Sequence, residues 1–195
     1  AIMRDPRAAR AAGLNANPRA ACAGCHDRKF NAQEGLRKIA HPTKLPPVAV
    51  SPRYKTPLNL ALRPGGQELY VACEASDSVI VVDLASRKKV AEIPVGGNPA
   101  DVTFSPDGKR AFVSNRLDDT VSVIDVAARR VIQTLRVGDE PHGVLTDRQG
   151  KLLYVLNTSS DDISVFDAAS LKRVKNLSAS RGPWSLALSP EGDRI

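Results

Sequence analysis

The sequence is poor in aromatic residues, methionine and cysteine. Its 195 residues include four Phe, three Tyr, one Trp, one Met and three Cys. Three cysteines are too few for a disulfide-built scaffold, and no apolar run approaches the ~20 residues that a membrane-spanning helix needs. With 42% hydrophobic and 25% charged residues, the composition is that of an ordinary globular protein. We therefore expect a folded chain that does not span a membrane.

The excess positive charge is confined to the N-terminal part of the chain. The formal net charge is +7, but residues 1–56 carry 11 Lys and Arg against 3 Asp and Glu, whereas residues 57–195 carry 17 against 18. Among the basic residues only Phe30 and Tyr54 could stack on bases, so the aromatic platform typical of a single-strand nucleic-acid site is missing. We therefore expect no nucleic-acid partner and an acidic protein partner for the basic segment.

A repeat of 42 residues fills the rest of the chain. Pro57, Pro99, Pro141 and Pro183 open successive units. A Gly follows each Pro nine residues later. In the three full units an aromatic residue and a Val come next. An Asp then ends the following apolar run in each of these units. These columns are Gly66, Gly108, Gly150 and Gly192, then Tyr70, Phe112 and Tyr154, then Asp83, Asp125 and Asp167. A fixed period of this length indicates a repeat architecture.

Each unit predicts four short strands. In the second unit these are residues 100–104, 110–115, 121–125 and 131–136, and a tight turn at 105–108 joins the first two. The third strands are apolar on both faces or nearly so, which is typical of strands that lie between neighbouring sheets. Four strands in ~40 to 50 residues predict one blade of a β-propeller. The units 57–98, 99–140 and 141–182 are then full blades, and 183–195 begins a fourth.

The second unit also resembles a known repeat. The stretches Ser105 to Asn115 and Thr120 to Asp125, followed by Val137-Gly138, resemble the YVTN-type β-propeller repeat. The first unit departs from it with Cys73 in place of Asn, and the third has residues 147–150 in place of Ser-Pro-Asp-Gly. The resemblance implies an all-β partial propeller over residues 57–195. Because a ring needs ~4 to 8 blades, we expect the rest of a longer chain, or another chain, to supply the missing ones.

The first 56 residues follow a different pattern. A short helix is predicted after Asp5-Pro6, ending at Gly13, and Asn31 with Glu34 is a possible capping box for a helix over 32–40. Residues 42–56 are rich in Pro and predict an extended linker. The sequence thus predicts a small α-helical segment over residues 1–41, a linker over 42–56 and the propeller.

Between the two predicted helices lies Cys22-Ala23-Gly24-Cys25-His26, the CxxCH attachment signature of c-type haem. In such a motif both thiols can add to haem vinyl groups, and the adjacent His can ligate the iron as proximal ligand. The segment resembles small cytochromes c at this motif and in its flanking helices, which implies covalent haem c. Two alternatives remain: a redox disulfide between Cys22 and Cys25, although the usual βαβ context is missing, and a zinc site with His41, although a fourth ligand is missing.

The sixth iron ligand is open. In small cytochromes c the distal Met lies well downstream of the motif, but the single Met here, Met3, lies upstream. His41, 15 residues after His26, is the candidate sixth ligand, and a plain surface histidine is the alternative. An open sixth position is the third possibility, and it would favour a small-ligand or peroxide site.

These patterns predict a c-type haem protein fused to a β-propeller, acting in periplasmic electron transfer or as part of a haem-dependent oxidoreductase. The resemblance implies a periplasmic or otherwise extracytoplasmic location and makes the expected acidic partner a redox protein. Similar combinations occur in nitrite reductases with an N-terminal haem c domain and in di-haem peroxidase relatives joined to YVTN-type propellers. The alternative is a non-redox extracellular propeller used as a binding module. No motif assigns a substrate or a reaction.

Three further features invite weaker interpretations. His142 has no equivalent His in the other units, so we expect a packed or rim side chain. Cys73 falls in a second strand and is expected to be a small buried side chain. The adjacent aspartates at 118–119 and 161–162 are expected to be solvated turn residues.

Overall fold

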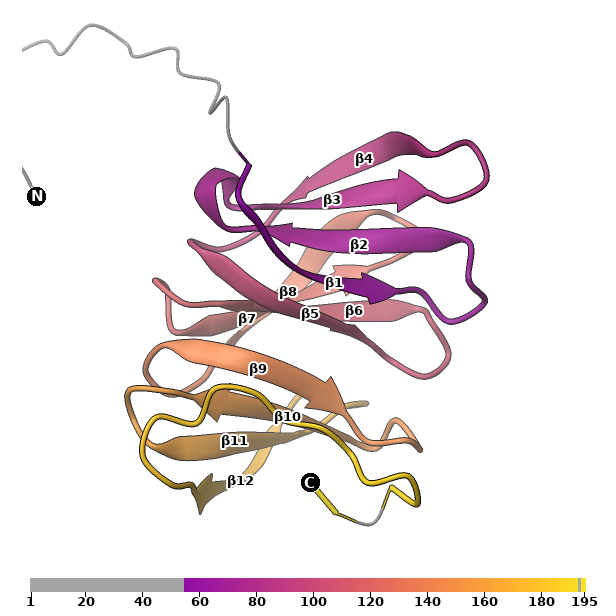
Figure 1. The fold of residues 1–195 in the computed structure, drawn as a ribbon. Coiled ribbons are helices and arrows are strands. Elements are labelled where there is room, and N and C mark those ends of the chain that lie inside the picture. Colours follow the sequence, from indigo (N-terminus) through magenta and orange to yellow (C-terminus); the bar gives the residue numbers. More distant parts are fainter. Residues whose placement is uncertain (1–54, 193) are drawn as a thin grey trace, which may run out of the picture. The chain divides into compact units, whose positions relative to one another are not determined.

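The computed structural model describes residues 55–192 and 194–195, which form three four-stranded antiparallel sheets (Figure 1). The first sheet contains β1 (Pro57–Leu62), β2 (Glu68–Cys73), β3 (Ser78–Asp83) and β4 (Lys88–Pro94). The second contains β5 (Pro99–Phe104), β6 (Arg110–Asn115), β7 (Thr120–Asp125) and β8 (Arg130–Arg136). The third contains β9 (Pro141–Thr146), β10 (Leu152–Asn157), β11 (Asp162–Asp167) and β12 (Arg173–Ser178). The predicted all-β partial propeller is confirmed.

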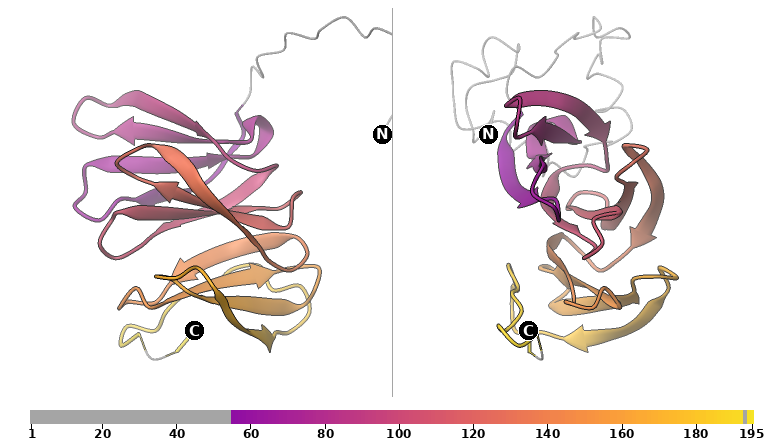
Figure 2. Two further views of the ribbon diagram at one scale, coloured as in Figure 1. Left: turned by 180° about the vertical axis from the view of Figure 1, so that it is seen from behind. Right: turned by 90° about the vertical axis from the view of Figure 1, so that its right-hand side faces the viewer.

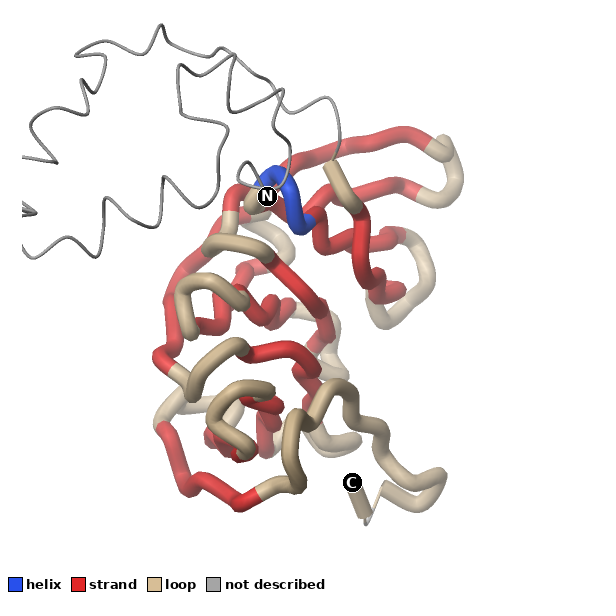
Figure 3. The backbone as a smooth tube through the Cα atoms, turned by 60° about the vertical axis from the view of Figure 1, so that its left-hand side comes forward, coloured by secondary structure: helices blue, strands red, loops and turns tan. Residues whose placement is uncertain are grey.

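The described chain has almost no helix. A single turn of 3-10 helix, η2 (Glu74–Ser76), follows β2 and is the blue segment of Figure 3. Within the described ranges, no helix has the length and apolar character needed to cross a membrane.

The order of strands in each sheet explains the pattern of burial. The first strands lie innermost, since β5 lies beside both β1 and β9, and the fourth strands lie on the outer rim (Figure 2). Almost every residue of β7 is buried because sheets cover both of its faces, whereas every residue of β12 is exposed. Apolarity on both faces of the third strand is therefore a consequence of its place between two blades.

All strands of a given order point the same way, so the propeller has two distinct ends (Figure 1). We call the end with the turns between the first and second and between the third and fourth strands of each sheet the turn end. We call the opposite end, where second strands connect to third strands and one blade connects to the next, the loop end. In Figure 1 the turn end lies on the right and the loop end on the left.

The turn between the first two strands needs a left-handed glycine, and the repeat supplies it. Gly66, Gly108, Gly150 and Gly192 have φ values of 75°, 65°, 68° and 76°, a conformation that costs glycine little. In the second sheet the Ser105 hydroxyl accepts the Arg110 N–H at 3.0 Å. In the third sheet Asp147 takes that place, and its Oδ1 accepts the N–H of Leu152 at 3.1 Å. The departure from the Ser-Pro-Asp-Gly pattern therefore preserves the turn.

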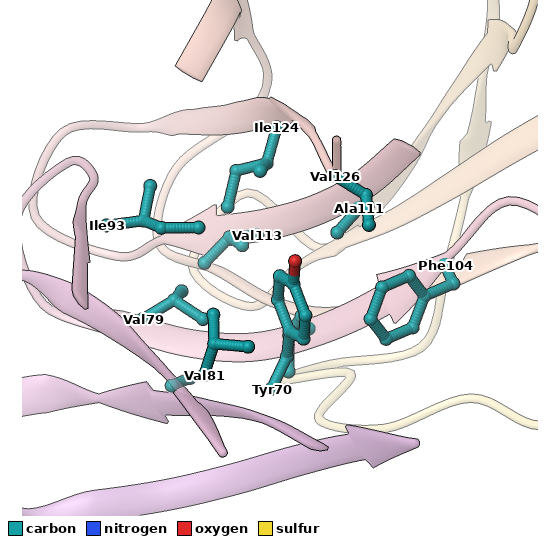
Figure 4. Packing of buried hydrophobic residues seen from close by; sticks show 11 residues of the cluster. Tyr70, Val79, Val81, Ile93, Phe104, Ala111, Val113, Ile124 and Val126 are labelled. Carbon is teal, nitrogen blue, oxygen red and sulfur yellow. The ribbon is translucent and has the colours of Figure 1, made fainter. Parts of the chain in front are cut away.

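Two apolar clusters join the three sheets. The first lies between the first and second sheets, where the rings of Tyr70 and Phe104 meet edge to face with centroids 4.9 Å apart (Figure 4). The second lies between the second and third sheets and includes Phe112, Leu153 and Phe166. Full burial of one such side chain stabilises the fold by about 1.5–3 kcal/mol.

The face of β1 that corresponds to the buried face of β5 is not covered by any described sheet. Ala100, Val102 and Phe104 of β5 are buried against the first sheet. The residues 42 positions earlier, Leu58, Leu60 and Leu62 of β1, are 44%, 62% and 54% exposed. Because the repeat gives these leucines the orientation of their β5 counterparts, they lie where a preceding blade would pack.

The asparagine of the repeat forms side-chain hydrogen bonds from the second strand to the third. The Nδ2 of Asn115 donates to the hydroxyls of Thr120 at 3.0 Å and Ser122 at 2.9 Å, and Asn157 repeats the arrangement with Asp162 and Ser164. In the first sheet Cys73 occupies the Asn column and Ile80 occupies the Ser column. The donor and one of its two acceptors are therefore replaced together, while Ser78 in the Thr120 column keeps a hydroxyl.

We predict energetic coupling between Asn115 and Ser122. Asn115→Ala leaves a buried hydroxyl without its amide partner and should lower the free energy of unfolding by about 1–3 kcal/mol. In the double variant with Ser122→Ala both polar groups are absent, so the loss should fall short of the sum of the two single losses by about 0.5–3 kcal/mol. Urea unfolding of the four proteins measures this coupling. Strict additivity would contradict the assignment, and Cys73→Ala serves as a control in a blade that lacks the amide.

Candidate functional site

The residues predicted to carry the haem chemistry lie outside the described residues. These are Cys22, Cys25, His26 and the candidate sixth ligand His41, together with Met3. The helical segment over 1–41 and residues 42–54 of the linker lie there too, and both stay predictions. The described chain does show which of its own side chains gather at the two ends of the propeller.

At the loop end, two aromatic rings from consecutive repeats stack. His142, the second residue of β9, is 3% exposed, and its ring lies 3.7 Å from that of Trp184, centroid to centroid, at an interplanar angle of 32°. Trp184 is 42 residues later in the same repeat column and is 59% exposed. The expected packed histidine is confirmed, whereas its stacking on Trp184 was not expected from the sequence. Its Nε2 is buried and has no hydrogen-bond partner among the described residues.

Charged side chains surround this ring pair. Arg116, from the loop after β6, lies 3.4 Å from Glu74 Oε1 through its Nη1, and its Nε is buried without a partner among the described residues. Burial lowers the pKa of His142 below its usual value, Arg116 lowers it further, and Glu140 and Glu74 oppose these effects. His142 is therefore held neutral near pH 7.

A half-buried carboxylate connects the second and third blades by a hydrogen bond, and sequence reasoning missed it. Asp101 of β5 accepts the N–H of Val144 in the next blade at 3.1 Å and that of Val102 at 2.9 Å. Burial raises the pKa of Asp101. Asn59 occupies the same repeat position one blade earlier and also bonds to the next blade, because its side chain donates to the Ala100 carbonyl at 3.0 Å. A polar residue at this repeat position could therefore have indicated a contact between blades.

The aspartates of the loop end do more than face solvent. Asp77, Asp119 and Asp161 each accept a backbone N–H from the residue 21 positions later, at 2.7–3.0 Å. Those N–H groups belong to the connections that lead into the next blade. The expectation of merely solvated turn residues was therefore incomplete, since these carboxylates also hold the connections between blades.

The remaining candidates are structural. Cys73 is 1% exposed, and burial raises the pKa of its thiol, so it is the small buried side chain that the sequence predicted. Over residues 55–192 and 194–195, no group of three or more His, Cys, Asp and Glu side chains could hold a metal ion.

The near-neutral propeller is strongly polarised between its ends. Carboxylates gather at the loop end, where Lys55, Arg116, Arg136 and Arg181 are the nearby cations among the described residues. The loop-end carboxylates of the three full repeats are Glu74, Asp77, Asp118, Asp119, Asp139, Glu140, Asp161 and Asp162. The turn end has the opposite balance, with cations exceeding carboxylates in the turns and at the strand ends.

Comparison with known proteins identifies similar folds. A family model described as "Lactonase, 7-bladed beta-propeller" matches residues 38–180. The chain is 28% identical to Kuenenia stuttgartiensis hydrazine synthase, with a TM-score of 0.70, over 76% of this chain and 43% of that one. A comparison with curated proteins finds no match.

Two Bacteroides structures, provisionally named 6-phosphogluconolactonases, share the fold at lower identity. The one from B. uniformis ATCC 8492 is 19% identical, with a TM-score of 0.62, over 70% of this chain and 45% of that one. The one from B. fragilis NCTC 9343 is 21% identical, with a TM-score of 0.63, over 68% of this chain and 42% of that one. The chain thus spans less than half the length of each of the three structures.

We predict that His142 makes the fold less stable in mild acid. A histidine whose pKa is lowered in the folded state favours folding while neutral, so stability falls as the pH drops below its unfolded value of about 6.5 and levels off below the folded pKa. His142→Phe keeps a ring against Trp184 but cannot titrate. Melting temperatures measured from pH 7.5 to 5 should therefore fall more for the wild type than for this variant. Parallel curves would contradict the interpretation.

Proposed function

We propose, for a chain that belongs to the lactonase family of seven-bladed β-propellers, that the propeller is the scaffold of a c-type haem protein. This protein transfers electrons or takes part in a haem-dependent oxidoreductase. The observation that carries the proposal is the CxxCH sequence at Cys22, Cys25 and His26. The similarity to a hydrazine synthase supports it, because propellers of this kind are then not confined to lactonases.

The donor set fits covalent haem. Two thiols and one imidazole in this order are the attachment chemistry of haem c, which supplies one-electron transfer at its iron when bound. Cys22 and Cys25 would hold the porphyrin through thioether bonds, and His26 would ligate the iron. Cys73 competes with neither thiol, because it is buried and its raised pKa keeps it protonated.

His41 is the proposed sixth ligand. His142 is committed to packing, since its ring is buried under Trp184 in the propeller. Of the three histidines in the chain, His41 is then the one left to pair with His26. Two histidine ligands would favour a low-spin iron.

The partner and the compartment follow from the same proposal. Residues 1–56 have an excess of eight positive charges, which would steer an acidic redox protein toward the haem segment. Haem c attachment implies a periplasmic or other extracytoplasmic location. The uncovered leucines of β1 support completion of the ring by further blades, from the rest of a longer chain or from another chain.

The first test is covalent haem attachment. Expressed in a host with a c-type maturation system, the chain should keep its Soret band after acid-acetone extraction. The double variant Cys22→Ala/Cys25→Ala should lose it because both thioethers are absent, and Cys73→Ala is the matched control that should retain it. A colourless wild-type protein would overturn the proposal and favour the non-redox binding module.

The sixth ligand has its own test. If His41 ligates the iron, His41→Ala should convert the ferric spectrum from low-spin to high-spin and open a position for cyanide. His142→Phe is the control and should leave the spectrum unchanged. A wild-type spectrum that is already high-spin would show an open position, and a low-spin spectrum that survives His41→Ala would assign another ligand; either result excludes His41.

A further inference from the structure

The structure points to a docking surface at the turn end of the propeller, and we propose that it binds an acidic surface of a partner protein. The turn between the third and fourth strands carries two adjacent cations in every blade. These pairs are Arg87-Lys88, Arg129-Arg130 and Lys172-Arg173. All six side chains are exposed, and the common direction of the strands places all three pairs at one end (Figure 1).

Most of these cations are not neutralised within the described chain. Arg129 pairs with Glu68 at 2.8 Å, and the Arg173 guanidinium lies 5.3 Å from the ring centroid of Phe166. The others, Arg87, Lys88, Arg130 and Lys172, form no ion pair with any described residue. Their charge is therefore available to a partner.

The nearest carboxylates serve the turns. Asp83, Asp125 and Asp167 end the third strands, and each accepts a backbone N–H three residues later at 2.7–2.8 Å. These hydrogen bonds hold the side chains against their own turns, so the carboxylates shape the turns that present the cations. They reduce the local positive potential but do not cancel two cations per turn.

A groove between two blades opens at the same end. It has a volume of about 240 Å³ and is lined by Pro106, Asp107, Arg110, Gly150, Ala168 and Ala169. Arg110 donates to the Ala168 carbonyl at 2.8 Å, which holds its guanidinium in the groove wall. The groove is thus a concave site at the turn end, and Ala168 and Ala169 in its wall belong to the turn that carries the third cation pair.

The difference in charge between the two ends of the propeller favours binding of an acidic partner at the turn end. Because the loop end gathers carboxylates, an acidic partner is repelled there and attracted to the turn end. A protein fits better than a nucleic acid, since the exposed indole of Trp184 lies at the loop end, the rings of Tyr70, Phe112 and Phe166 are buried, and Tyr154 is only partly exposed. No exposed ring for base stacking accompanies the described cations.

The surface is independent of the haem proposal, because it consists only of propeller residues. The test uses the full chain and a fluorescein-labelled octaglutamate peptide, with affinity measured by anisotropy at low salt. The triple variant Lys88→Glu/Arg130→Glu/Lys172→Glu reverses one repeat column, with one change in each blade. The matched control, Arg136→Glu/Lys175→Glu/Arg181→Glu, changes the net charge equally, at two loop-end positions and one position within β12.

We expect the turn-end variant to weaken binding of the peptide at least about tenfold and the control to change it less than about threefold. Equal weakening by both variants would show a net-charge effect, and no change in either would place binding on the N-terminal segment; both outcomes overturn the proposal. Tighter binding of an oligothymidylate of equal charge, lost in the same variant, would also overturn it. If the Glu variant does not fold, the corresponding Gln variants should give a smaller loss in the same order.

Discussion

The fold depends on the burial of both faces of each sheet against a neighbouring sheet. Val121 and Val123 of β7 point to the same face and are fully buried, and Ile124 on the opposite face is fully buried as well. No single four-stranded sheet can cover such a strand by itself, so each blade is stable only next to another. The same constraint explains why the leucines of β1 are exposed in the described chain, because no described sheet covers them.

Polar contacts then fix how one blade sits on the next. The Thr146 hydroxyl donates to the Phe104 carbonyl at 2.9 Å, and Asp101 accepts the Val144 N–H at 3.1 Å. Both cross the junction of β5 with β9, where apolar packing alone would allow the strands to slide. Buried polar groups that find partners in this way specify the register of the blades.

The two ends of the propeller differ in charge because each repeat places acidic residues in the turns at one end and basic residues in the turns at the other. Loop-end aspartates accept N–H groups of the connections between blades, and turn-end cations follow the aspartates that close the third strands. Each of these residues serves its own turn, but the 42-residue repeat places equivalent residues at the same end of all three blades. A nearly neutral domain therefore acquires an acidic end and a basic end, and the proposed haem function and docking surface would operate on such a polarised scaffold.

Much of this fold could be predicted from the sequence, since the 42-residue columns, the turn glycines and the doubly apolar third strands are local patterns. Predicted strands such as 110–115 match the observed bounds, and CxxCH is itself a sequence pattern. The stacking of His142 on Trp184, the blade-to-blade bond of Asp101 and the separation of charge were not predictable in this way. They arise when residues about 42 positions apart meet across a blade junction, or when strand direction collects distant turns at one end. Sequence alone thus determined the repeating unit, whereas tertiary packing decided which units touch and which charges share a face.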